Sequence, residues 1–150
     1  MKAFAGGKAK KAQCLDSLSI SKNVSVPADK QKVRFGYRLK NGSKRVARFL
    51  FGLELNFSLL DAHFNRLGEA VGVLRFALVD PLTRQEVAVA LNRPARLWYF
   101  PVEANVKTSS GTERVYQGVR VACLWEVRLP PGRSWAVRGE LSVRALGVDE

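Results

Sequence analysis

Apolar and polar residues alternate along much of this chain, and a period of two is typical of half-buried β-strands. The clearest case is 32–40, where every second residue is apolar and four of the residues between them are Lys or Arg. The same alternation predicts further strands at 47–57, 70–79, 86–91, 97–103 and 115–129, and a last strand that carries Trp135, Val137, Leu141 and Val143. Six or seven strands without an internal repeat predict an all-β protein, an antiparallel β-sandwich with at most one short helix.

Three connecting segments and one proline carry turn or loop signals. Asn41-Gly42 favours a tight hairpin between the first two predicted strands, because both residues tolerate a positive φ. Residues 58–69 fit either a short helix or an irregular loop. Pro101 lacks an N–H group and predicts a sheet edge or the end of a strand. Residues 104–113 are the least regular interior segment and predict a loop that is anchored to the sheet.

The length and the charge distribution indicate one domain with a basic start. A chain of 150 residues suffices for one core, and we expect a sandwich domain at 18–146 between a flexible basic tail at 1–17 and a short tail at 147–150. Residues 1–50 contain 13 Lys and Arg but two acidic residues, within a total net charge of +12. Such a region attracts nucleic acid or other anionic polymers. The candidate anion-binding residues are Lys8, Lys10, Lys11, Lys44, Arg45 and Arg48.

Several function classes are not supported by the sequence. No stretch approaches the ~20 apolar residues of a membrane span, and no secretion signal is present, so a cytoplasmic protein without a membrane partner is expected. Cys14 and Cys123 stand far apart without a neighbouring Cys or His, which predicts no metal site, and no cofactor motif is found. Cys123 lies in an apolar run and is expected to be buried. His63 next to Asp61 lacks a nucleophile motif and receives no catalytic role.

Polar residues at unexpected places in the predicted strands are the candidates for a site. Each of them must be hydrogen-bonded if it is buried, so it either ties a loop to the sheet or lines a pocket. Trp98 and Tyr99 point to opposite faces of one strand, so one of the two is exposed and could stack on a sugar ring. The candidates for carbohydrate contact or loop anchoring are Glu54, Asn56, Trp98, Glu103, Glu113 and Gln117.

Four segments together resemble a known family. They are FGLELNFSLL at 51–60, LWYFPVE at 97–103, ERVYQG at 113–118 and LWEVRL at 124–129. In order and spacing, from about residue 18 to residue 146, they are similar to the C-terminal β-sandwich domain of glycoside hydrolase family 57 α-amylases and 4-α-glucanotransferases. The resemblance implies a galactose mutarotase-like fold and an accessory role, since the family's catalytic carboxylates belong to a separate N-terminal barrel. The chain departs from the family pattern at 103–113.

Three functions remain open at this point. The first is a non-catalytic accessory domain that docks on a catalytic-domain protein or binds α-glucan weakly. The second is a nucleic-acid or anionic-polymer binder that works through the basic N-terminal region. The third is a carbohydrate-active enzyme with a pair of carboxylates, which would have to converge on one cleft. A long edge strand at 115–129 would in addition favour a homodimer or a partner protein.

Overall fold

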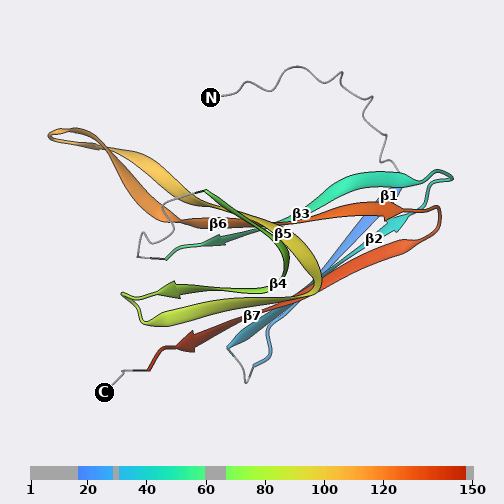
Figure 1. Ribbon diagram of the computed structural model, residues 1–150, viewed down its shortest axis with the longest axis horizontal. Coiled ribbons are helices and arrows are strands. Elements are labelled where there is room, and N and C mark those ends of the chain that lie inside the picture. Colours follow the sequence, from blue (N-terminus) through green and yellow to red (C-terminus); the bar gives the residue numbers. More distant parts are fainter. Residues whose placement is uncertain (1–16, 29–30, 60–66, 148–150) are drawn as a thin grey trace.

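The computed structural model describes residues 17–28, 31–59 and 67–147 and has seven strands in these segments (Figure 1). The strands are β1 (Leu18–Ser25), β2 (Lys32–Asn41), β3 (Ala47–Phe57), β4 (Gly68–Asp80), β5 (Gln85–Thr108), β6 (Gly111–Leu129) and β7 (Ser134–Ala145). All strand pairs are antiparallel, which confirms the predicted fold class. The described part of the chain contains no helix, and hence none that could cross a membrane.

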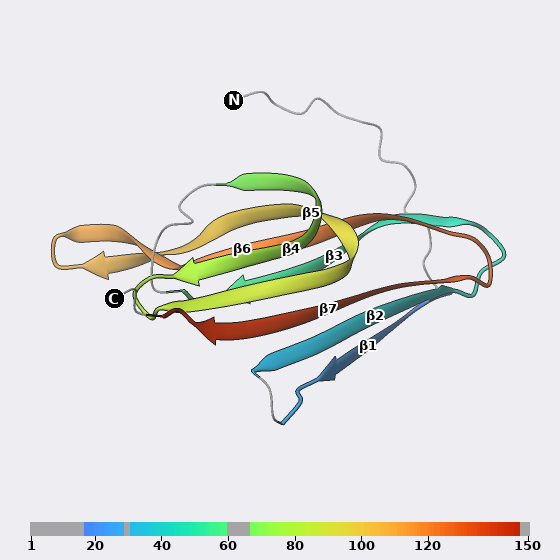
Figure 2. The same ribbon diagram turned by 60° about the horizontal axis from the view of Figure 1, so that its bottom comes forward.

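The strands form one sheet that folds over into two layers. Their order is β1-β2-β7-β5-β6-β3, and β4 pairs with the other side of β5. The first part of β5 pairs with β7 up to Leu91, and its second part pairs with β6 from Arg96 onward. Between these two residues β5 bends from the lower layer, which holds β1, β2 and β7, to the upper layer, which holds β3 and β6 (Figure 2).

The core lies between the two layers and is built from the apolar residues of the alternating pattern. Leu39, Val89 and Val137 of the lower layer are fully buried, as is Cys123 of the upper layer. Aromatic rings join the layers, because Phe51 on β3 lies 5.4 Å from the Trp135 ring on β7 and 5.5 Å from the Tyr37 ring on β2. The alternation therefore records which side of each strand faces the opposite layer.

The expected hairpin at Asn41-Gly42 is wrong. β2 pairs with β1 and β7, whereas β3 pairs with β6, so the chain crosses from one layer to the other at this point. Asn41 is 2% exposed, and its side-chain amide donates to the carbonyl oxygens of Arg45 (2.7 Å) and Leu129 (2.8 Å). The φ of Asn41 is not positive, so a turn conformation does not explain the asparagine at this position. Its buried side-chain hydrogen bonds do.

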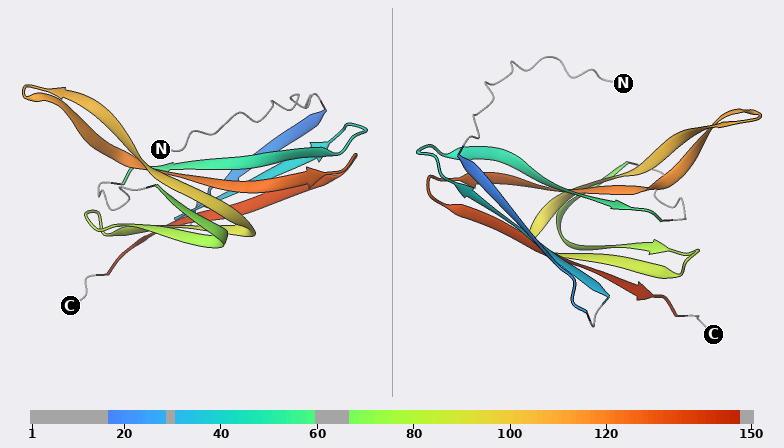
Figure 3. Two further views of the ribbon diagram at one scale, coloured as in Figure 1. Left: turned by 45° about the horizontal axis from the view of Figure 1, so that its top comes forward. Right: turned by 180° about the vertical axis from the view of Figure 1, so that it is seen from behind.

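The predicted loop at 104–113 is also wrong. β5 and β6 continue through this segment as a two-stranded arm, Val102–Gly118, and pair with each other up to Thr108 and Gly111. Figure 3 shows in both views that the arm projects away from the rest of the sheet. Pro101 does not end a strand, but among the described residues the pairing of β4 with β5 stops at Tyr99, so Pro101 lies where β5 has become an edge.

Two further expectations concern strand edges and the helix. The strand at 115–129 is not an edge, because β6 pairs with β3 on one side and β5 on the other, and the edges of the sheet order are β1 and β3. The expectation of a homodimer therefore has no support from an edge strand at this position.

The predicted helix or loop at 58–69 lies largely outside the described residues, and Gly68 already belongs to β4.

Candidate functional site

The outward side of the upper layer brings three of the predicted site residues together. Glu54 on β3 is opposite Ala122 on β6, and Ala122 is opposite Trp98 on β5. The next row on the same side consists of Asn56, Arg120 and Phe100. We call this surface the Trp98 face and define it by Glu54, Asn56, Trp98, Phe100, Arg120 and Ala122.

Arg120 connects the polar groups of the Trp98 face. Its Nε lies 3.2 Å from the Glu54 carboxylate and donates to the Asn56 carbonyl oxygen at 3.0 Å. The Asn56 amide in turn donates to Glu54 at 3.4 Å. The Arg120 guanidinium also lies 5.5 Å from the centre of the Phe100 ring, close enough for a cation–π contact. The polar groups are therefore held in position without a ligand.

A groove of about 620 Å³ adjoins the Trp98 face where β5 bends. It is lined by all three tryptophans of the chain, Trp98, Trp125 and Trp135, by Leu50 and Leu124, and by the charged residues Arg93, Arg96 and Glu126. Trp98 is 44% exposed, whereas Trp125 is 7% exposed and its Nε1 has no hydrogen-bond partner among the described residues. Grooves with aromatic walls and few polar groups are typical binding sites for small ligands.

The other predicted carbohydrate contacts lie on the arm. Glu103 forms an ion pair with Arg114 at 3.3 Å, and Glu113 lies opposite Val106 near the tip. Gln117 does not face the apolar row as expected. It occupies a bulge, because Val102 pairs with Gly118 and Glu103 pairs with Tyr116, and its side chain is exposed. The structure thus separates these three residues from Glu54, Asn56 and Trp98.

The carboxylates near the Trp98 face are bound to separate arginines. Glu54 pairs with Arg120, and Glu69 pairs with Arg96 at 3.4 Å. These pairs are half-exposed, unlike the water-excluded carboxylates of an acid–base pair. The described residues contain no group of three or more His, Cys, Asp or Glu that could hold a metal ion.

The predicted anion-binding residues do not form one patch in the described structure. Lys8, Lys10 and Lys11 lie outside the described residues, as do His63 and Cys14. Lys44 and Arg45 are exposed in the connection between β2 and β3, and Arg48 is exposed on β3 opposite Arg128. Cys123 is fully buried as predicted, and burial raises the pKa of its thiol to about 11.

Sequence reasoning missed Arg120 and Phe100, the two residues that complete the Trp98 face. Both were visible as outward positions of alternating strands, since Arg120 stands between Val119 and Val121 and Phe100 between Tyr99 and Pro101. Their pairing with Asn56 depends on the strand order, which a single sequence does not reveal.

A family model and a related sequence agree on one family. The sequence model described as "Alpha-amylase/4-alpha-glucanotransferase, C-terminal" matches residues 6–138. Alpha-amylase 1 of Dictyoglomus thermophilum is 26% identical over 128 aligned residues, which cover 77% of this chain and 19% of the amylase.

Solved structures share the fold. The 4-alpha-glucanotransferase from Thermococcus litoralis superposes with a TM-score of 0.66 at 20% identity, over 86% of this chain and 18% of the enzyme. The Slr1438 protein from Synechocystis sp. PCC 6803 superposes with a TM-score of 0.59 at 10% identity, over 85% of this chain and 55% of that protein. The chain spans about a fifth of the length of the two enzymes.

Proposed function

The chain belongs to the family of C-terminal domains of α-amylases and 4-α-glucanotransferases, and on this premise we propose that it is a non-catalytic accessory module that binds α-glucan through the Trp98 face. The family match confirms the resemblance seen in the sequence. The matching segments make up 19% of the amylase and 18% of the glucanotransferase, and we assign no catalytic step to the present residues.

The observation that carries the proposal is an exposed tryptophan beside fixed hydrogen-bonding groups. The apolar C–H face of a glucose ring packs on an aromatic ring, and its hydroxyl groups pair with carboxylate, amide and guanidinium groups. Trp98 supplies the ring, and the polar groups come from Arg120 on the neighbouring strand β6 and from Glu54 and Asn56 on the strand beyond it, β3. Because Arg120 already holds Glu54 and Asn56, little side-chain entropy would be lost on binding.

The test is a calorimetric titration of the protein with maltoheptaose and glycogen. We expect saturable binding that Trp98→Ala weakens at least ~10-fold, which corresponds to about 1.4 kcal/mol. Trp98→Phe keeps an aromatic ring and should retain most of the affinity. Val24→Ala, at a comparably exposed apolar position on β1, is the control and should bind like the parent protein.

The same samples test the absence of catalysis. Maltoheptaose incubated with the protein should remain unchanged in length when it is examined by chromatography. Turnover that survives purification would contradict a non-catalytic module. Equal affinity of the Trp98→Ala variant and the parent would exclude the Trp98 face as the glucan site.

A second candidate function, docking on a catalytic-domain protein, is favoured by the outward side of β5. Alternate residues of this strand are apolar on the side that faces away from the core, namely Trp98, Phe100, Val102, Ala104 and Val106. On the arm, Val106 is 41% exposed, and Val115, which lies opposite Ala104, is 38% exposed. Apolar residues on both faces of a strand are typical of a sheet that is covered on both sides. A defined complex with a catalytic-domain protein, formed by a chain that binds no glucan, would favour this function.

A further inference from the structure

The outward side of the lower layer carries a row of positive charge. Along β2 every second residue faces outward, and four of these five are cationic. The fifth is Gly36, and the residue opposite it on β7 is Arg138. We call this surface the basic track and define it by Lys32, Arg34, Arg38, Lys40 and Arg138. None of them belongs to the anion-binding residues predicted from the sequence.

The strands on both sides of the basic track present short side chains, so the cations stand above their surroundings. The neighbours facing the same way are Ser19, Ser21, Asn23 and Ser25 on β1 and Ser134, Ala136, Ser142 and the longer Glu140 on β7. Their hydroxyl and amide groups can donate hydrogen bonds to a ligand that lies along β2. The result is a line of cations along β2 between two rows of mainly short side chains.

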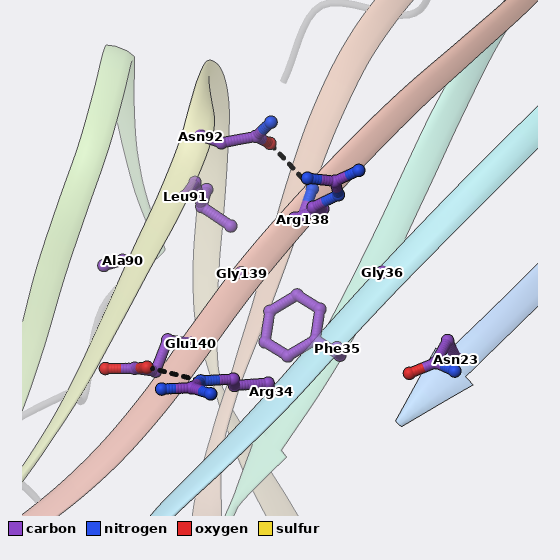
Figure 4. A pocket seen from close by; sticks show the side chains of 10 residues that line it. All are labelled: Asn23, Arg34, Phe35, Gly36, Ala90, Leu91, Asn92, Arg138, Gly139 and Glu140. Carbon is purple, nitrogen blue, oxygen red and sulfur yellow. Dashed lines mark hydrogen bonds and ion pairs between the residues drawn. The ribbon is translucent and has the colours of Figure 1, made fainter. Parts of the chain in front are cut away.

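Two adjoining hollows, of about 490 and 320 Å³, lie on the basic track and share Asn23, Gly36 and Arg138. In Figure 4 the side chains of Arg34 and Arg138 lie on the two sides of the Phe35 ring, with Asn23 on the adjacent strand. Gly36 has no side chain, which keeps the floor low between the arginines. The first hollow holds Arg34 and Arg138, and the second holds Arg38 and Arg138.

Most of the positive charge of the basic track is not neutralised by the protein. Glu140 accepts from Lys32 at 2.6 Å and from Arg34 at 3.1 Å, and these hydrogen bonds lower the pKa of its carboxyl. Within the described residues, Arg38, Lys40 and Arg138 lie within ion-pair distance of no carboxylate. Three cations are therefore available to an anionic ligand.

We propose that the basic track binds the phosphodiester backbone of a nucleic acid laid along β2. Arginine forks pair with phosphate oxygens, and Ser and Asn side chains are common phosphate contacts. A protein partner fits less well, because protein interfaces need a large apolar centre. The outward side chains of this surface are Ser, Asn, Gly, Ala, Glu140 and cations, and the apolar lining of the first hollow is limited to Phe35, Ala90 and Leu91. The aromatic residues of β2, Phe35 and Tyr37, pack against the core, so bases are not stacked and sequence is not read.

This site is independent of the proposed glucan function, because it lies in the other layer. The test measures binding of a fluorescein-labelled 20-nucleotide DNA, single-stranded and as a duplex, by anisotropy between ~50 and ~200 mM salt. The variant Arg38→Gln/Lys40→Gln/Arg138→Gln removes the three unpaired charges. The matched control Lys44→Gln/Arg48→Gln/Arg128→Gln removes three exposed charges from the β2–β3 connection and the upper layer. All proteins keep the basic start of the chain.

We expect the affinity of the basic-track variant for both DNA forms to fall ~10-fold or more. The slope of log K against log salt should become shallower by about 0.7–0.9 for each phosphate that the variant no longer neutralises. The control should bind like the parent, and thermal melts should show that both variants are folded. Equal losses of affinity in the two variants would overturn the proposal. DNA would then be attracted by the net charge of the whole protein, or bound by the anion-binding residues predicted from the sequence, and not by the basic track. No binding by the parent, or displacement by polyglutamate as readily as by unlabelled DNA, would overturn it as well.

Discussion

Asn41 connects three parts of the molecule through hydrogen bonds of its main chain and side chain. Its side-chain amide reaches Leu129 at the end of β6, and its carbonyl oxygen accepts from the Gly132 N–H at 2.8 Å. Its side-chain oxygen accepts from the Ser43 N–H at 2.9 Å and shapes the turn between the layers. A single buried amide therefore fixes where the chain passes from β2 to β3.

Asn41→Ala should destabilise the protein by about 2 kcal/mol, because the Leu129 carbonyl would remain buried without its donor. Urea denaturation followed by tryptophan fluorescence measures the change. Asn92→Ala is the control, since the Asn92 side-chain oxygen accepts from the backbone N–H of Arg138 in an exposed setting and its removal should cost clearly less. Equal losses of stability in the two variants would show that the buried position of Asn41 adds nothing.

Cys123 should be chemically silent in the folded protein. It is fully buried and burial raises its pKa to about 11, so very little thiolate is present at pH ~8. In a Cys14→Ser variant, in which Cys123 is the remaining thiol, we expect no labelling by iodoacetamide at that pH until denaturant is added. Rapid labelling without denaturant would mean that the core opens at this strand.

At the scale of the elements, the β6 bulge explains how a strand of the sheet becomes part of the arm. β3 pairs with β6 as far as Phe57 and Val119, and the next residue, Gly118, has a φ of 152°. A Cβ at Gly118 would lie 2.3 Å from the Phe57 carbonyl oxygen. Glycine is therefore required where the backbones approach each other and β6 turns away from β3.

Gly118→Ala should cost about 2 kcal/mol or more, through both backbone strain and the clash with Phe57. Gly111→Ala at the tip of the arm separates these effects, because Gly111 also has a positive φ of 140° but nothing within 4 Å of the added Cβ. We expect a smaller loss of stability for this variant in the same urea titration. A loss as large as that of Gly118→Ala would attribute the effect to φ alone.

The alternation of residues predicted most strands, but it could not predict which strands pair. Residues 32–40 and 47–57 are strands as expected, yet they lie in different layers, since a local turn signal does not specify the partner of a strand. β1 was missed because Ile20 and Val24 are more than half exposed on an edge strand and polar residues stand on both of its faces. The arm was missed because its residues are largely exposed on both strands and the apolar alternation of β5 stops at the polar run 107–114.

The candidate site was predictable only in part for the same reason. Glu54, Asn56 and Trp98 were identified as outward residues, but that they share one face with Arg120 follows from β3, β6 and β5 being neighbours. Gln117 was misplaced because the bulge changes the side to which β6 residues point. One extra residue in a strand moves all the side chains beyond it to the opposite face of the sheet, so a face assigned from alternation alone is then wrong.

At the scale of the whole molecule, a net charge of +12 makes the few acidic ion pairs important for the response to pH. Hydrogen bonds from Lys32 and Arg34 lower the pKa of Glu140, and a hydrogen bond from Arg144 lowers that of Glu86. A folded-state pKa below that of the unfolded chain stabilises the protein above the usual glutamate range, and this stabilisation disappears as the pH falls through the folded value. Acid also protonates the carboxylates, so the net positive charge rises and repulsion among the cations destabilises the folded state.

Glu140→Gln should lower the urea midpoint at neutral pH, and the difference from the parent should shrink as the pH is lowered toward ~3, because the parent glutamate takes up a proton as the pH falls through its lowered pKa. The effect should be modest and weaker in high salt, because the ion pairs are partly exposed. Glu113→Gln is the control, since Glu113 forms no ion pair among the described residues. A Glu140→Gln difference that is the same at both pH values would show that the charge of Glu140 is irrelevant.

The bend of β5 between the layers has a consequence for how the chain folds. One strand is hydrogen-bonded to β4, β6 and β7, so neither layer can be completed while β5 is disordered. The lower layer also joins residues far apart in sequence, such as Lys32 and Glu140 at a separation of 108 positions. Such non-local pairing is associated with folding in milliseconds to seconds and with all-or-none unfolding. During synthesis, β7 would therefore have to leave the ribosome before β2, with β1 paired to it, could join the rest of the sheet.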